Sequence, residues 1–509
     1  MPCIRFFQME KKKKMMTMTV TMKQGMSPRM KMRKRSLPPI LSRRKLICVA
    51  LLIVFLAGCI LGRSEDPRDE DDPYNRLKNL HDPKTFGDIL YEYIRDIVKV
   101  PVIATVFFCW VCGSFADEHG RVGAMQLFFM LSGIGFGFLV YAQEYDFSIL
   151  GTFILGAALG CSIPAPIYIA ELCPVAYRSF FLGLVPVALS LGMFTVDVIE
   201  LRGAEDTAWK SLCCLSGIGF LLSLFLHEAP EWLVMRNRPD AAIESLKWLK
   251  ETSADVDVDL RKLQETSMAA NQRSDTTLEM LTDKRIWKPF AMLLGLALFQ
   301  HLCGFYILIF YAPYLVNQYR TNIYWFSSYT GTDFLLLVAT SAALVFHANL
   351  PRRTVAGLSG IGSSAALLGL FLHAHLFVAP QDLLDPTPDK DMLVPIFFFT
   401  LYIFSAVMGI YTLPWILMFE VFPLRHRGVL CGLSFSTLYM GLFAFESRLN
   451  NYLLTGMDLQ SLLCFFGTCA LGFALFARSC LVETHKKTFE EIERGFTKER
   501  IFLPIDEKM

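Results

Sequence analysis

Long apolar stretches separated by short charged segments make up most of the chain. A bilayer core about 30 Å thick needs roughly 20 residues of apolar helix, so stretches of that length bounded by charge, Pro or Gly predict membrane spans. The longest stretches contain Pro or Gly, and we expect their helices to be broken or tilted. The pattern predicts an all-α integral membrane protein with twelve spans, at residues 45–62, 97–117, 122–142, 147–172, 180–200, 209–227, 287–316, 326–346, 354–376, 392–422, 428–454 and 459–480.

The composition supports this class and orients the chain. Hydrophobic residues make up 53% of the 509 residues, and Phe occurs 43 times. Residues 1–44 contain thirteen Lys or Arg against Glu10 alone, whereas the segment after the first span is mostly acidic. By the positive-inside rule the N-terminus is cytoplasmic, and an even number of spans returns the C-terminus to the same side. We predict a disordered basic tail over residues 1–44 and a cytoplasmic tail over residues 481–509.

The residue patterns of enzymes do not occur in the sequence. It contains no Gly-rich phosphate loop, nucleophile elbow or metal-ligand cluster, so we expect neither catalysis nor a metal or cofactor. Nearly all of the 14 cysteines fall in predicted spans, where cysteine packs as a small hydrophobic residue. We interpret Cys109 and Cys112, spaced like a redox pair, in the same way. The expected partners are a small solute and the lipid bilayer, not nucleic acid.

The charges at the ends of the spans repeat along the chain. Glu171, Pro174 and Arg178 follow the pattern E-x2-P-x3-R, and the same pattern recurs six spans later as Glu420, Pro423 and Arg427. A second pair in this register, Glu228 and Glu483, follows the sixth and twelfth spans. The two halves therefore read as related copies, as in transporters built from parallel repeats. We predict bundles over residues 45–227 and 287–480, joined by a cytoplasmic helical linker over residues 228–286.

A carboxylate at the end of a span can pair with an arginine that begins the next helix, within the interfacial layer. If one half rocks against the other, such pairs hold the inner ends together in one state and release them in the next. The alternative is that these charges only anchor the helix ends at the membrane surface. The candidate gating residues are Asp117, Arg121, Glu171, Arg178, Glu228, Glu420, Arg427 and Glu483.

Several motifs in order make the chain similar to a known family. They are "GSFADEHGR", "PIYIAELCPVAYRS", "HEAPEWL", "FQHLCGFYILIFYAP", "PWILMFEVFPLRHRG" and "VETHKKTFEEIE". Over about residues 45–495 the chain resembles the sugar porters of the major facilitator superfamily, and among them most the insect facilitated trehalose transporters and animal glucose facilitators. The resemblance implies two six-helix bundles, alternating access, and a sugar held near the middle of the bilayer by amide and aromatic side chains.

The residues that would hold the sugar are only partly kept. Where the family has two glutamines and an asparagine in the seventh span, this sequence has Gln300, His301 and Tyr306. A neutral imidazole can donate or accept one hydrogen bond but cannot bind two hydroxyls as an amide does; His301 either lines the path or packs between helices. The resemblance implies a substrate path lined by Gln300, His301, Tyr306, Tyr311, Trp415 and Tyr439.

Charged residues inside the predicted spans indicate the kind of solute and the mode of transport. The first span has no acidic residue, which favours facilitated diffusion over the proton coupling of some relatives. Asp333 lies about 10 Å into the eighth span, where it either serves as a counter-charge or proton site or faces an outer aqueous vestibule. We therefore predict a plasma-membrane transporter of a sugar or sugar-like solute. The alternatives are a non-transporting sugar sensor or interaction protein, and a facilitator of a charged organic solute.

Overall fold

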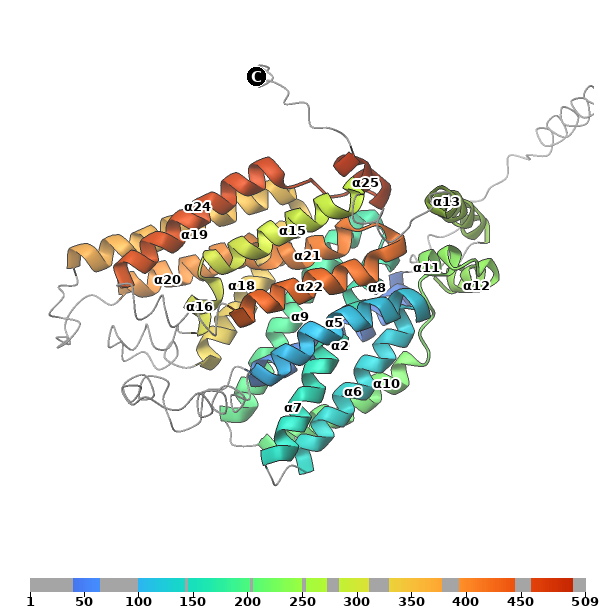
Figure 1. The fold of residues 1–509 in the computed structure, drawn as a ribbon, viewed down its shortest axis with the longest axis horizontal. Helices are drawn as coiled ribbons and strands as arrows, with labels where there is room; N and C mark the ends of the chain where they lie inside the picture. The colour runs from blue at the N-terminus through green and yellow to red at the C-terminus, as the bar shows by residue number, and fades with distance from the viewer. Residues whose placement is uncertain are drawn as a thin grey trace, which may run out of the picture. The chain divides into compact units, whose positions relative to one another are not determined.

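The computed structural model describes residues 40–64, 99–141, 145–201, 205–249, 253–271, 283–310, 329–377, 393–444 and 459–497. The described residues from Ser42 onward belong to one compact unit, Ser42–Met509, and nearly all of them are helical (Figure 1). Met1–Leu41 forms a separate unit. The basic tail predicted for residues 1–44 therefore falls almost entirely outside the described residues.

In the part of the protein that the structure describes, each predicted span coincides with one helix or with consecutive helices separated by a short break. Eight helical segments are long and apolar enough to cross a membrane, and two shorter apolar helices, Ile47–Leu61 and Thr207–Ser223, match the first and sixth spans. The helices are α2 (Ile40–Ser64), α5 (Lys99–His119), α6 (Arg121–Tyr141), α7 (Tyr145–Gly160), α8 (Pro164–Leu172), α9 (Val175–Leu201), α10 (Glu205–Ser223), α15 (Lys284–Leu302), α16 (Phe305–Phe310), α18 (Tyr329–Asn349), α19 (Arg352–Phe377), α20 (Leu393–Ala406), α21 (Thr412–Val421), α22 (Arg427–Ala444) and α24 (Leu459–Cys480).

Three of the four longest predicted spans are interrupted, as their Pro and Gly content suggests. A turn separates α7 from α8, which begins at Pro164. Gly304, with φ +72°, separates α15 from α16; only glycine adopts this conformation without strain. A π-helical turn, η1 (Val407–Tyr411), lies between α20 and α21 just before Pro414. Such breaks free backbone groups near the middle of a span, where transporters place their binding sites.

The packing of the helices follows the two halves of the chain. In the first half α7 packs on α5 and α6, and α6 packs on α10; in the second, α19 packs on α20 and α24. The halves meet where α5 packs on α22 and α9 on α18, and Figure 1 shows α5 and α22 side by side. A Cβ on Gly113 would lie 2.4 Å from the carbonyl oxygen of Gly428. The backbones of α5 and α22 therefore touch at this crossing.

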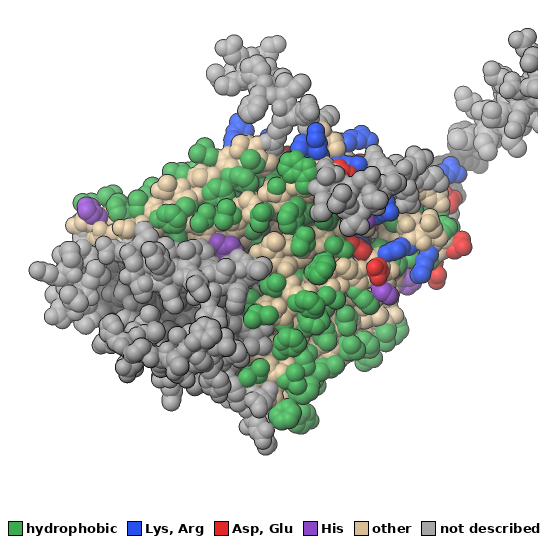
Figure 2. Space-filling view, in the orientation of Figure 1, with side chains coloured by type: hydrophobic (Ala, Val, Ile, Leu, Met, Phe, Trp, Pro, Cys, Tyr) green, Lys and Arg blue, Asp and Glu red, His purple; other side chains and the backbone are tan. Residues whose placement is uncertain are grey.

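Short helices follow the sixth and twelfth spans. They are α11 (Pro230–Met235), α12 (Pro239–Leu249), α13 (Ser253–Asn271) and α25 (Phe489–Thr497). Figure 2 shows charged side chains gathered near these helices, whereas hydrophobic side chains cover the visible face of the spanning helices. Exposed residues such as Phe107, Trp110 and Leu475 contribute to the apolar surface. A surface of this kind suits contact with lipid.

Candidate functional site

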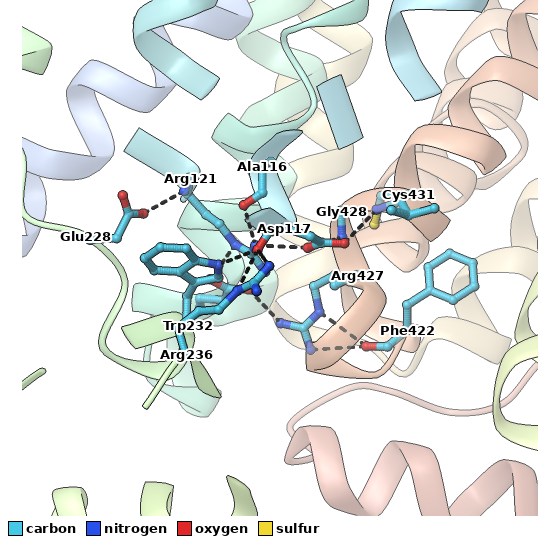
Figure 3. Close-up of polar contacts among 12 residues, drawn as sticks. Ala116, Asp117, Arg121, Glu228, Trp232, Arg236, Phe422, Arg427, Gly428 and Cys431 are labelled. Carbon is cyan, nitrogen blue, oxygen red and sulfur yellow. Dashed lines mark hydrogen bonds and ion pairs between the residues drawn. The ribbon is translucent and has the colours of Figure 1, made fainter. Parts of the chain in front are cut away.

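The first group of candidate gating residues converges on Arg121, the first residue of α6. Its side chain is 1% exposed and forms ion pairs of 3.0 Å with Asp117 and 3.0 Å with Glu171. It also donates a hydrogen bond to the carbonyl oxygen of Ala116 at 2.9 Å (Figure 3). A guanidinium carries several donors in a fixed planar fork, which allows it to satisfy both carboxylates and a carbonyl at once.

Two contacts join this group to the second half of the chain. The carboxylate of Asp117 accepts hydrogen bonds from the backbone N–H groups of Gly428 at 3.0 Å and Val429 at 2.9 Å. These N–H groups lie at the start of α22, where the helix dipole favours a negative charge. Arg427, fully buried, forms an ion pair with Glu171 at 3.4 Å. Both contacts must break if the halves separate at this end.

The second half repeats the arrangement around Arg352, the first residue of α19. Arg352 is fully buried and forms an ion pair with Glu420 at 3.3 Å. It donates to the hydroxyl of Ser179 on α9 at 3.0 Å, a third contact between the halves. The hydroxyl of Thr484 donates to the other oxygen of Glu420 at 2.6 Å. We call the two arginine-centred groups together the charged rim: Asp117, Arg121, Glu171, Arg352, Glu420 and Arg427.

Glu228 and Glu483 occupy equivalent positions beside the charged rim. Glu228 accepts hydrogen bonds from the backbone N–H groups of Arg121 at 2.6 Å and Val122 at 3.1 Å. Glu483 accepts from the N–H groups of Arg352 at 2.8 Å and Arg353 at 3.2 Å. Burial raises the pKa of Glu228 above its usual range, although the two N–H groups act in the opposite direction. Each carboxylate therefore caps the helix that begins with the central arginine of its half.

The ion pairs do not form between the Glu and the Arg of the same E-x2-P-x3-R motif, although the sequence suggests that pairing. Glu171 pairs with Arg121 and Arg427, and Glu420 pairs with Arg352. Arg178 instead donates from Nε to the carbonyl oxygen of Ala170 at 3.1 Å.

The guanidinium groups of Arg178 and Arg427 lie over the same ring, that of Phe489 on α25, at 3.7 and 3.9 Å from its centroid. The pattern of charged residues in the sequence does not predict the contacts made by Ser179, Thr484 and Phe489.

Three candidates from the seventh span lie close together. Gln300 is fully buried, and its Nε2 donates to the hydroxyl of Tyr306 at 3.0 Å and to the carbonyl oxygen of Tyr411 at 3.5 Å. Its Oε1 is buried without a hydrogen-bond partner among the described residues. His301 is buried with its ring 5.3 Å from that of Tyr306. Gln300 thus offers an acceptor that a bound hydroxyl could satisfy.

Trp415 lies at a small cavity between the halves. The cavity is lined mostly by apolar side chains of α2, α7–α9, α21 and α22, among them Val54, Pro166, Leu189, Trp415 and Phe435, with the polar Ser162. Trp415 packs edge-on against Phe435, with ring centroids 5.0 Å apart. Its Nε1 is buried without a hydrogen-bond partner in the described structure. An indole in this position provides an apolar face and one donor to a solute.

The structure describes only part of the remaining predicted site residues. Tyr311 lies outside the described residues, as does the side chain of Tyr439, whose backbone belongs to α22. Asp333, on α18, is 5% exposed and lies in the packed contact between α18 and α9, where Asp197 is also buried and its charge acts on Asp333. Within the described ranges, no three His, Cys, Asp or Glu side chains converge as metal ligands would.

Two repeated halves, a charged rim that joins them at one end and a small cavity between them define a secondary transporter of the major facilitator class. The family described as "Sugar (and other) transporter" matches residues 87–496. The chain belongs to this family, whose members are membrane transporters. The prediction of transport rather than catalysis is therefore confirmed.

Curated relatives and solved structures agree with this assignment. The chain is 28% identical over 353 residues to the facilitated trehalose transporter Tret1 of Drosophila grimshawi, a match that covers 68% of this chain and 37% of that protein. It is 29% identical over 357 residues to the facilitated trehalose transporter Tret1-2 homolog of Drosophila simulans, covering 68% and 70%.

The proton:xylose symporter XylE, bound to 6-bromo-6-deoxy-D-glucose, has the same fold, with a TM-score of 0.68 and 17% identity over 89% of this chain and 99% of XylE. The predicted fold class and resemblance are thus confirmed.

Proposed function

We propose that the protein carries a sugar or sugar-like solute across the plasma membrane by facilitated diffusion with alternating access, with both termini in the cytoplasm. The observation that supports this most is the charged rim, because its contacts among the described residues join the two halves where α5 and α8 end and where α9, α19 and α22 begin. When these contacts break, the cavity beside Trp415 would open toward the rim. When they form, it would open on the other side.

The proposed moving bodies are residues 45–227 and 287–480, with 228–286 as the cytoplasmic linker and 1–44 and 481–509 as cytoplasmic tails. The equivalent capping of α6 by Glu228 and of α19 by Glu483 supports this division. Each cap ties the segment that follows a bundle back to the third helix of the same bundle, α6 or α19. Each half could therefore move as a unit, with its own arginine group intact.

The proposed substrate path includes Gln300, His301, Tyr306 and Trp415, together with Tyr311 and Tyr439. A solute hydroxyl would donate to Oε1 of Gln300, while Trp415 would cover an apolar face of the ring. The matched relatives are named as trehalose transporters and the fold relative as a xylose symporter. These names and the buried polar atoms together favour a sugar over an apolar solute.

Uptake of radiolabelled trehalose and glucose into proteoliposomes tests this proposal. Gln300→Ala should raise KM about tenfold, because one hydrogen bond to the solute is lost. Gln460→Ala is the matched control, since Gln460 donates to the carbonyl oxygen of Ala374 away from the path. Uptake of any sugar no greater than that of empty vesicles would remove the sugar assignment.

A second candidate function is transport of a cationic solute. The two buried carboxyl groups of Asp197 and Asp333 favour it, because buried charges within a span commonly mark a cation or proton pathway. Asp333→Asn should then abolish uptake of the cation, whereas sugar uptake would be unaffected. Retained cation uptake in this variant would exclude a role for Asp333 in it.

A further inference from the structure

Glu231 is a charged residue beside the rim to which the transport cycle described above gives no role. It belongs to α11, which also contributes two fixed contacts to the rim: Trp232 donates from Nε1 to the carbonyl oxygen of Asp117 at 2.9 Å, and Arg236 donates to the same oxygen at 2.6 Å (Figure 3). The side chain of Glu231 is half-buried, and its Oε2 is buried without a hydrogen-bond partner among the described residues.

The charges that act on Glu231 come from both halves of the molecule. Glu171 and Arg178 belong to the first half, and Arg427 belongs to the second. Arg121 acts on it as well. The helix α11 also packs on η2 (Leu424–His426) of the second half, and on α12 and α13. The other titratable groups on these three elements with described side chains are Arg425, His426, Asp240, Glu244, Lys247, Asp257, Asp259, Arg261, Lys262 and Glu265.

Closure of the rim determines the environment of this carboxyl group. Burial, and to a smaller extent the charge of Glu171, raise the pKa of Glu231, while the three arginines oppose the shift; together these causes move the pKa from 4.5 to about 7. Separation of the halves would expose the group to water and so remove desolvation, the largest cause of the shift; this outweighs the loss of Arg427, and the pKa returns toward the usual value. The closed rim therefore binds the proton more tightly than the open rim.

We propose that Glu231 is a pH-sensitive switch of the charged rim, whose protonated form favours the closed rim and whose ionised form favours the open one. By linkage, proton binding contributes its full free energy to closure at pH values below the usual pKa of a glutamate. This contribution is lost as the pH rises through neutrality. The switch thus works over the pH range of a cytoplasm. It rests on the proposed gating role of the rim but not on the identity of the solute.

Hydrogen–deuterium exchange of the full-length protein in nanodiscs tests the switch without any substrate. Exchange in residues 116–122 and 424–430 is measured at pH 6 and pH 8 and corrected for the chemical exchange rate at each pH. The open fraction should be about tenfold larger at pH 8 than at pH 6. Glu231→Gln, which cannot ionise, should give the same high protection at both pH values.

Two further variants separate the switch from general effects on structure. Glu244→Gln removes an exposed carboxylate from neighbouring α12 and should keep the pH dependence of the wild type. Glu231→Asp keeps an ionisable group and should keep a pH dependence, which covers the case that Glu231→Gln fails to fold. Protection that is equal at both pH values in the wild type would overturn the proposal. So would a pH dependence that survives in folded Glu231→Gln.

Discussion

At the scale of single residues, the charged rim is stable because every buried charge in it has several partners. Arg121 contacts two carboxylates and a carbonyl oxygen, and Glu171 contacts two arginines. Arg427 also donates from Nε and Nη2 to the carbonyl oxygen of Phe422, each at 3.2 Å. Buried ion pairs tolerate their desolvation only when such additional hydrogen bonds are present. The rim should therefore be sensitive to the loss of one member.

Glu171→Gln removes the charge shared by Arg121 and Arg427. We expect the variant to lose about 3–5 kcal/mol of stability, because two buried guanidinium groups remain with too little negative charge. Thermal unfolding in detergent measures the loss. Glu490→Gln is the matched control, since its ion pair with Arg494 is 3.6 Å long and largely exposed, and it should change stability by less than about 1 kcal/mol. Equal shifts in the two variants would contradict this account of the rim.

The sequence predicts that Glu171, Arg178, Glu420 and Arg427 gather at span ends, but it does not predict how they pair. Spacing along one helix pair cannot show that Glu171 faces α6, or that Arg178 turns toward the carbonyl of Ala170. Those choices depend on how separate helices pack. A second pair of equivalent arginines, Arg121 and Arg352, supplies the missing partner of each carboxylate.

At the scale of helices, the crossing of α5 and α22 depends on two glycines. A Cβ on Gly428 would lie 2.4 Å from the carbonyl oxygen of Gly113, the reciprocal of the contact made by Gly113. This crossing holds Asp117 beside the start of α22, where it accepts the N–H groups of Gly428 and Val429. The close approach of these helices is therefore a condition for the contacts between the halves.

Gly113→Ala should push α5 away from α22 and destabilise the protein by about 1–3 kcal/mol. The strain falls on backbone atoms, which cannot move aside as a side chain would. Gly357→Ala on α19 is the control, because nothing lies within 4 Å of its added Cβ, and alanine favours a helix over glycine by about 1 kcal/mol. Unfolding temperatures of the two purified variants distinguish them. An unchanged unfolding temperature for Gly113→Ala would show that the crossing is loose.

Hydropathy predicts the helices themselves well, because a bilayer imposes one length and one composition on every span. It does not locate the π-helical turn at Val407–Tyr411, since that turn depends on contacts with other helices. Ser359 of α19, for example, accepts the N–H of Ile410 at 3.0 Å. The same limit applies to the path, where the hydrogen bond between Gln300 and Tyr306 follows from the break at Gly304.

At the scale of the whole molecule, the contacts between the halves have an unequal distribution along the helices. Ion pairs and hydrogen bonds join the halves at the starts of α9, α19 and α22. Near the other end of α9 and α18, the described contact instead includes the rings of Phe194 and Phe334, 5.7 Å apart, and two buried carboxyl groups. This asymmetry fits two bundles that alternate between closure at one end and closure at the other.

Spin-label distances between the two halves test this central claim most directly. Labels attached through ketone-bearing amino acids leave the native cysteines unchanged, and four exposed positions are suitable: Tyr177 with Arg425 at the rim, and Tyr141 with Leu376 about 30 Å away along the helices. In Glu171→Gln, we predict that the distance between the rim pair lengthens while that of the distant pair shortens. Distances that both lengthen, or that both stay unchanged, would contradict alternation about a latched rim.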